Sequence, residues 1–133
     1  MSEENVETVR RLYGLWPDRD FSSAEEVVHP DAVFDVSRNV FNPGVYRGID
    51  GFLRFIEQVD EMWGNFQFEP EELIDAGDNV VAAIRISGKG RESGVEVEMQ
   101  LFVIWTFREG KVLRYTGGYR DRSEALEAAG LQE

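Results

Sequence analysis

The sequence has no cysteine, and that absence excludes several classes of site. Without thiols the chain has no disulfide framework, thiol nucleophile, zinc finger or iron–sulfur cluster. A cysteine-free chain suits a reducing compartment, so we predict a cytoplasmic protein. Histidine is nearly absent as well, since His29 is the only one. Because transition-metal sites usually draw on several His or Cys ligands, we expect no metal, and the lack of a nucleotide-binding loop motif predicts no cofactor.

Positive charge is also scarce. The chain carries 14 Lys and Arg residues against 26 Asp and Glu residues, which gives a formal net charge of −12 at pH 7. Nucleic acids and anionic membrane surfaces bind basic patches, so we expect neither as a partner. The same charge mildly disfavours small anions, although a single local Arg can override it. No apolar run approaches the length of a membrane-spanning helix.

What the chain does contain is a long alternation of apolar and polar residues over Gly94–Tyr119. It predicts two long antiparallel strands joined by a turn at Glu109-Gly110, because a period of two is typical of strands with one buried face. The return strand, Val112–Tyr119, would place Tyr115 and Tyr119 on the same apolar face. The first strand would bury Val95, Val97, Met99, Leu101, Val103, Trp105 and Phe107.

Helical periodicity dominates the first half of the chain. Ser22 and Glu25 resemble a capping box for a short helix, which His29-Pro30-Asp31 would end. Asp50 would cap a longer helix with a wide apolar face. The predicted elements are helices over 2–16, 22–28 and 50–63, a short strand over 32–36, and a loop with a turn at Asn42-Pro43-Gly44 over 38–48.

Strands dominate the second half. Phe66–Ile74 carries Pro70, which suits an edge strand or a bulge, and Val80–Gly88 alternates again. Arg85 would lie on the outer face, paired with a Glu of a neighbouring strand. Ser123 would cap a last helix over 124–129. We therefore predict one domain, residues 1–133, of the α+β class, in which three N-terminal helices cover the concave face of a strongly curved, mostly antiparallel sheet.

Four local motifs resemble one family. They are Tyr46-Arg47-Gly48, Asp75–Val81, Thr106–Val112 and Tyr119–Leu126. Together with the order of elements, they resemble the nuclear transport factor 2-like superfamily, particularly its SnoaL-like branch of polyketide cyclase-like and ketosteroid isomerase-like proteins. The resemblance implies a cone-shaped fold with an apolar pocket between the helices and the concave face. It implies no single activity, because one fold hosts many functions.

The resemblance also implies which side chains form that pocket. Carried onto this sequence, the ligand-binding residues are Trp16, Phe55, Ile84, Leu101, Val103, Trp105, Tyr115 and Tyr119. The opposite face of the long strand holds Gln100, Phe102 and Ile104, which is more apolar bulk than water tolerates well. Members of the superfamily commonly pair their sheets there, so we expect a homodimer through the outer sheet face.

Asp35 and Tyr13 are the candidates for catalysis. The family's isomerases use a carboxylate base, a second acid and a tyrosine, at positions that hold Val36, Val103 and Leu12 in this chain. Asp35 and Tyr13 each lie one residue away, and a one-residue shift on a strand turns a side chain to the opposite face. Asp35 is therefore either a solvent-exposed carboxylate or a pocket acid or base with a raised pKa. Tyr13 either packs in the pocket wall or steadies an enolate.

Two functions remain open from the sequence. The first is binding of a small hydrophobic, polyketide- or steroid-like molecule, with proton abstraction beside a carbonyl as the reaction of an isomerase or aldol-type cyclase. The second is a non-catalytic module for ligand binding or dimerisation. An inward acid within hydrogen-bonding reach of a tyrosine would favour an enzyme. A pocket with no inward acid and no inward His would favour binding alone.

Overall fold

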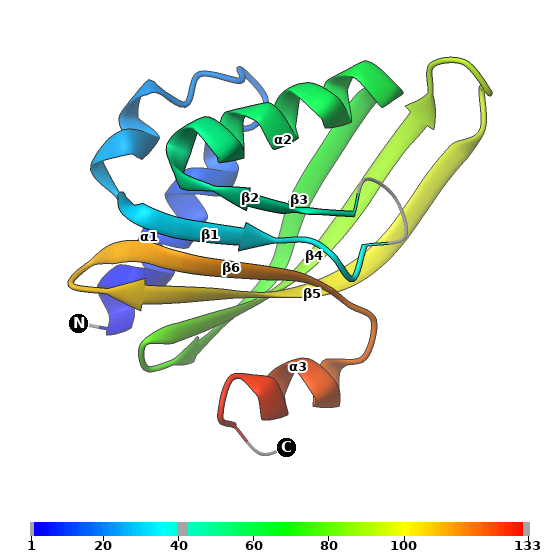
Figure 1. The fold of residues 1–133 in the computed structure, drawn as a ribbon. Coiled ribbons are helices and arrows are strands. Elements are labelled where there is room, and N and C mark those ends of the chain that lie inside the picture. The colour runs from blue at the N-terminus through cyan, green and yellow to red at the C-terminus, as the bar shows by residue number, and fades with distance from the viewer. Residues whose placement is uncertain (1, 40–42, 132–133) are drawn as a thin grey trace.

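Six strands form one open, mixed sheet in the computed structural model, which describes residues 2–39 and 43–131 (Figure 1). The strands are β1 (Val28–Asp35), β2 (Val45–Arg47), β3 (Trp63–Ala76), β4 (Asn79–Gly90), β5 (Glu96–Arg108) and β6 (Lys111–Tyr119). Their spatial order is β2-β1-β6-β5-β4-β3, and among these described strands only β1 and β6 pair in parallel. The prediction of an α+β fold with a mostly antiparallel sheet is confirmed.

Helices cover both faces of this sheet. They are α1 (Ser2–Gly14), α2 (Gly48–Met62) and α3 (Arg122–Ala128), with a 3-10 helix, η1 (Ser22–Glu26), between α1 and β1. The helices α1 and α2 pack on one face, which we call the inner face, and α3 packs on the outer face (Figure 1). None of the described helices combines the length and the apolar composition needed to cross a lipid bilayer.

The long hairpin of β5 and β6 agrees with its prediction except at its start, where β5 begins at Glu96 and the predicted buried residue Val95 is exposed. Glu109 and Gly110 turn the chain with φ angles of 53° and 80°, a region that Gly adopts without steric cost. Val103, Trp105 and Phe107 are buried in the inner core, as the alternation requires. At the far edge of the sheet, β3 is an edge strand with a register shift between Pro70 and Glu72, which confirms the predicted effect of that proline.

The segment between α1 and α2 differs from its prediction. The second helix is only the 3-10 helix η1, and no side chain caps it. The strand begins at Val28 instead of Ala32, so His29 lies inside β1 and does not end a helix. Its Nδ1 accepts a hydrogen bond from the backbone N–H of Asp31 at 3.0 Å. Pairing with β6 favours the strand, because it satisfies backbone groups that a short isolated helix leaves open.

The loop predicted over 38–48 contains a further strand. Residues of β2 pair antiparallel with β1, and α2 begins directly after β2 at Gly48, two residues before the predicted cap at Asp50. The predicted turn at Asn42-Pro43-Gly44 lies partly outside the described residues. The expected three N-terminal helices are thus α1, a single 3-10 helix and α2, and the helix count of the prediction was wrong.

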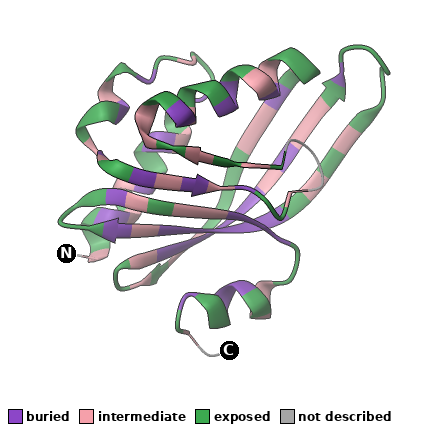
Figure 2. Cartoon of the chain, in the orientation of Figure 1, coloured by how far each residue is buried: buried purple, intermediate pink, exposed green. Residues whose placement is uncertain are grey.

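The core divides into two clusters, one on each face of the sheet (Figure 2). The inner cluster joins Val9 and Leu12 of α1 and Phe55 and Val59 of α2 to the inward residues of the sheet. The outer cluster joins Ala125, Leu126 and Ala129 to Val81, Ala83, Phe102, Ile104 and Tyr119. Because β4 and β5 contribute buried residues to both clusters, these central strands are buried on both faces.

The outer cluster corrects the predicted exposure of the outer face. Phe102 and Ile104 are only 6% and 5% exposed, because α3 of the same chain covers them. The cap of α3 also differs from the prediction, since the Asp121 side chain accepts from the N–H of Ser123 at 2.8 Å. The two apolar residues that motivated a homodimer therefore already have an intramolecular partner. The homodimer itself stays a prediction.

We predict that Ile104→Ala destabilises the protein without changing the inner face. Removing a fully packed Ile side chain should lower the free energy of unfolding by about 2–5 kcal/mol, because a cavity is left beneath α3. Urea denaturation followed by circular dichroism measures this loss. Val95→Ala is the control, since Val95 is 58% exposed and should cost little. Equal effects of both substitutions would contradict the packing of α3 on the outer face.

Candidate functional site

Two adjoining cavities lie between the inner face and the helices, within the part of the chain that the structure describes. The sheet cavity is lined mainly by β3, β4, β5 and α2, and the helix cavity lies between α1, α2 and β1. Phe55, Phe68 and Tyr115 belong to both walls. The sheet cavity has a volume of about 40 Å³ and the helix cavity one of about 50 Å³. One water needs about 10–15 Å³ of such space, so a bulky ligand requires wall side chains to move.

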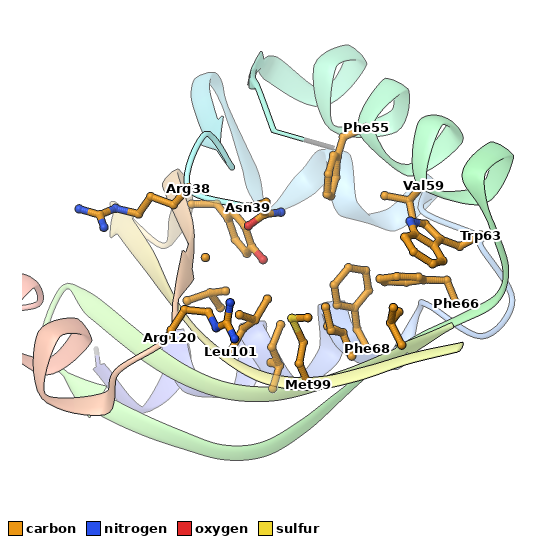
Figure 3. A pocket seen from close by; sticks show the side chains of 16 residues that line it. Arg38, Asn39, Phe55, Val59, Trp63, Phe66, Phe68, Met99, Leu101 and Arg120 are labelled. Atoms are coloured by element: carbon orange, nitrogen blue, oxygen red, sulfur yellow. The ribbon is translucent and has the colours of Figure 1, made fainter. Parts of the chain in front are cut away.

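All predicted pocket residues except Tyr119 line these cavities. The sheet cavity includes Phe55, Ile84, Leu101, Val103 and Tyr115, and the helix cavity includes Trp16, Phe55, Trp105 and Tyr115. In the sheet cavity, Phe55 and Val59 reach in from α2, the aromatic rings of β3 close one end, and polar side chains stand at the other (Figure 3). The contribution of these residues to ligand binding stays a prediction.

The walls are poor in groups that exchange protons near neutral pH. No Asp, Glu or His belongs to the described lining of either cavity. The positions that the family's isomerases fill with acids hold Val36 in the helix cavity and Val103 in the sheet cavity. The side chains in the walls that bear polar groups are Tyr13, Trp16, Trp63, Trp105, Tyr115, Arg38, Asn39 and Arg120.

Three aromatic residues, Trp105, Tyr13 and Tyr115, meet at the junction of the cavities. The indole N–H of Trp105 donates to the Tyr13 hydroxyl oxygen at 3.2 Å. The Tyr13 hydroxyl also interacts with that of Tyr115. A tyrosine hydroxyl can donate as well as accept, so the Tyr115 hydroxyl can donate its proton to a ligand oxygen.

Ring packing holds Tyr13, Trp105 and Tyr115 in place. The rings of Tyr13 and Trp105 meet edge to face with centroids 5.6 Å apart, and those of Trp105 and Tyr115 do so at 4.7 Å. Desolvation by burial is the largest influence on both tyrosines and raises the pKa of each well above its ordinary value. Both hydroxyls therefore remain protonated at neutral pH. Tyr115 can act as a hydrogen-bond donor, and neither tyrosine can act as a base.

Asp35 lies on the wrong face to serve the pocket. Phe34 and Val36 point into the inner core, so strand alternation turns Asp35 outward. Its carboxylate accepts from the Ser37 hydroxyl at 2.6 Å and from the Ser37 N–H at 3.0 Å, and Arg114 Nη2 donates to it at 2.9 Å. The hydrogen bonds from Ser37, aided by Arg114, lower the pKa of Asp35. The interpretation of Asp35 as a pocket base with a raised pKa is contradicted.

Tyr119 lies on the outer face, although Tyr115 lies on the inner face. The register between β5 and β6 shifts between the pairs Ile104–Thr116 and Phe102–Tyr119, so β6 carries one extra residue there. A bulge of this kind reverses the alternation beyond it. Gly118, with a φ of 89°, sits at the bulge. Tyr119 consequently packs in the outer cluster, which corrects its predicted place in the pocket wall.

Trp16 is held rigidly at the end of α1. Its indole N–H donates to the carbonyl oxygen of Phe66 at 2.8 Å, and the guanidinium of Arg19 lies 4.0 Å above its ring. Arg19 also bridges to both carboxylate oxygens of Asp60 in α2 at 3.1 Å. These contacts tie the end of α1 to α2 and β3. The sequence pattern predicted Trp16 but contained no sign of the Arg19–Asp60 pair, whose members are 41 residues apart.

Arg38, Asn39 and Arg120 were not predicted from the sequence. They stand at the polar end of the sheet cavity, where the segment after β1 meets the segment after β6. The Gly117-Gly118 pair was the available signal, since an added Cβ at Gly118 would lie 2.8 Å from Arg38 Cβ and from Asn39 Oδ1. Among residues 2–39 and 43–131 there is no cluster of three or more His, Cys, Asp or Glu side chains suited to a metal ion.

Comparisons with known proteins agree with this architecture. A model of the SnoaL-like domain matches residues 9–115. No curated protein matches the chain. Among solved structures, an NTF2-like protein of unknown function from Burkholderia pseudomallei is 21% identical, with a TM-score of 0.75 over 93% of this chain and 95% of that one.

Two further structures extend the comparison. TerC, co-crystallised with polyporic acid, is 24% identical, with a TM-score of 0.73 over 96% of this chain and 98% of its own. A candidate SnoaL-like polyketide cyclase from Jannaschia sp. CCS1 is 24% identical, with a TM-score of 0.72 over 86% of this chain and 84% of its own. At these identities the likeness concerns the fold.

We predict that the buried Tyr115 hydroxyl makes the protein lose stability in alkali. The unfolded chain releases the tyrosine proton near pH 10, whereas the folded chain retains it, so the free energy of unfolding should fall as the pH rises above about 10. Urea denaturation at about pH 8 and about pH 11 should show a smaller fall for Tyr115→Phe than for the wild type. Phe68→Leu, which removes no titrating group, should keep the wild-type fall. Identical falls in all three proteins would contradict the burial of this hydroxyl.

Proposed function

This chain belongs to the SnoaL-like domain family, and from that premise we propose that it binds a small hydrophobic molecule bearing a carbonyl or hydroxyl oxygen, of polyketide or steroid type. The observation that carries the proposal is the Tyr115 hydroxyl, a hydrogen-bond donor in walls that are mostly aromatic and aliphatic. Tyr115 lines both cavities, and its neighbour Tyr13 already accepts a hydrogen bond from Trp105. Apolar walls with a few directed polar groups are typical of small-molecule sites.

The cavity walls would bind the apolar body of the ligand and its oxygen through different residues. The apolar body of the ligand would gain affinity from contact with rings such as Phe55 and Phe68, because transfer of apolar surface out of water is favourable. The ligand's oxygen would accept the Tyr115 proton. A hydrogen bond in such a desolvated place orients the ligand, because a mispositioned ligand would leave both polar groups unpaired.

Binding without proton abstraction is the form of the function that the walls favour. An isomerase or aldol-type cyclase needs a base beside the carbonyl, and the described lining contains no carboxylate or imidazole. Tyr115 could polarise a carbonyl but its raised pKa prevents it from taking a proton. We therefore place the non-catalytic, ligand-binding form ahead of the enzymatic form.

The binding proposal predicts different effects of Tyr115→Phe on two ligands of the same shape. Acetophenone can accept the Tyr115 proton and ethylbenzene cannot. The Kd of acetophenone should rise by about 2–10-fold in Tyr115→Phe, the size of one neutral hydrogen bond, while the Kd of ethylbenzene stays unchanged. NMR titration of the tryptophan indole N–H signals measures both constants, because Trp16 and Trp105 line the helix cavity.

Tyr46→Phe is the matched control for that experiment. Its hydroxyl donates to Gln58 Oε1 at 2.5 Å and belongs to neither cavity wall, so both Kd values should match those of the wild type. Absence of saturable binding of both compounds to the wild type would contradict the proposed function. An equal loss of both ligands in Tyr115→Phe would contradict the role of the hydroxyl.

The absence of a wall base predicts no acceleration of proton exchange. In D₂O buffer the methyl protons beside the carbonyl of acetophenone should exchange at the same rate with and without saturating protein, because no described wall group can abstract them. Proton NMR follows the loss of the methyl signal. Exchange that is faster with the wild type, and slower again in Tyr115→Phe, would restore the enzymatic form.

A further inference from the structure

The polar end of the sheet cavity holds two arginines that are engaged very differently. Arg38 Nη1 donates to Glu124 Oε1 at 3.0 Å, and its guanidinium stacks on the Tyr119 ring at 4.5 Å. Figure 3 shows that the Arg38 guanidinium points away from the cavity, whereas the Arg120 guanidinium points toward it. Among the described residues, Arg120 has no carboxylate within 4.0 Å and no hydrogen-bond partner.

Arg120 is exposed, and it is the cavity-lining member of several arginines that have no carboxylate partner among the described residues. The formal net charge is −12, and Arg85, Arg114 and Arg122 on the outer side of the sheet each pair with a carboxylate. At the cavity, Arg120 instead faces a wall built from Met99, Leu101 and other apolar side chains. A guanidinium next to apolar surface is weakly screened by water on that side, so it attracts an anion more strongly there than on open surface.

A second unsatisfied group lies beside it. Asn39 Oδ1 is buried without a hydrogen-bond partner among the described residues. It lies against Gly118, where an added Cβ would approach it to 2.8 Å. Buried polar atoms normally have partners, and an amide oxygen only accepts, so Asn39 Oδ1 would be satisfied by an N–H or O–H group of a ligand or by water, and the anionic oxygen proposed below would bind to Arg120 alone.

From these observations we propose that Arg120 selects ligands whose polar end carries an anionic oxygen, such as a carboxylate, a phenolate or an enolate. This inference rests on the proposed binding function and specifies the chemical class of its ligand. The apolar body of the ligand lies in the sheet cavity and its anionic oxygen accepts from the Arg120 guanidinium at the polar end. The negative net charge repels anions elsewhere on the surface, so the preference depends on this one side chain.

Two probes of equal size test the proposal. Benzoate and acetophenone share one aromatic ring, but only benzoate is charged at about pH 8. The wild type should bind benzoate about tenfold more tightly than acetophenone, the scale of one partly exposed, charge-assisted hydrogen bond. In Arg120→Gln that preference should vanish through a higher Kd for benzoate, while the Kd for acetophenone stays unchanged. Added salt should reduce the preference of the wild type.

Arg122→Gln is the matched control, because it changes the net charge equally two residues away. Arg122 pairs with Glu72 on the outer side of the sheet, so this variant should keep the preference for benzoate. Equal binding of both probes to the wild type, or an equal loss in both variants, would overturn the role of Arg120 and leave the proposed function standing. Absence of binding by either probe would overturn both.

Discussion

The central strands of this protein are apolar on both faces, and the rest of the structure depends on covering them. Val80–Ile84 of β4 and Leu101–Trp105 of β5 are buried without interruption. A strand of this kind needs a partner layer above and below, because side chains alternate between the faces. The helices α1 and α2 supply one layer and α3 supplies the other.

The two layers differ in the size of the side chains that they pack against the sheet. The short helix α3 contributes Ala125, Leu126 and Ala129, which are small enough to fill the space over Phe102 and Ile104. On the inner face, large rings from the segment after α1, from α2 and from β3 pack together, as in the edge-to-face pair of Trp16 and Phe68 with centroids 4.6 Å apart. The two cavities lie on this inner face, so the proposed ligand site lies there as well.

The pattern of apolar residues predicted what local periodicity controls. The two long strands, their Glu109-Gly110 turn, the edge position of Pro70 and the inward residues of β4 and β5 all follow from period-two alternation and turn chemistry. The prediction from this pattern failed where contact with a distant part of the chain decides the secondary structure or the burial of a residue. Pairing of Val28 with Val112 of β6 extends β1 back to Val28, and no pattern within residues 28–31 records that partner. The cover provided by α3 was missed for the same reason.

The bulge in β6 decided which residues meet in the site. Phe102 pairs with Tyr119 and Trp105 pairs with Tyr115, yet the two β5 residues are three positions apart and the two β6 residues are four positions apart. Strict alternation places Tyr115 and Tyr119 on the same face, because it does not allow for the extra residue that a bulge inserts. The positive φ of Gly118 and the close approach of Asn39 permit the insertion. The same bulge thus sends Tyr119 to the outer face and turns the chain so that Arg120 reaches the cavity.

The chemistry of the inner face follows from which charged side chains face the cavity and which face outward. The Asp35 carboxylate accepts hydrogen bonds from Ser37 and Arg114 outside the cavity. Its lowered pKa keeps it ionised, so these contacts persist at neutral pH. Arg38 likewise forms an ion pair with Glu124 outside the cavity. What remains toward the cavity is a neutral donor at the centre, Tyr115, and a cation at one end, Arg120. Donor and cation both stabilise electron-rich oxygen and neither removes a proton, so these walls suit recognition of an oxygen-bearing ligand better than its deprotonation.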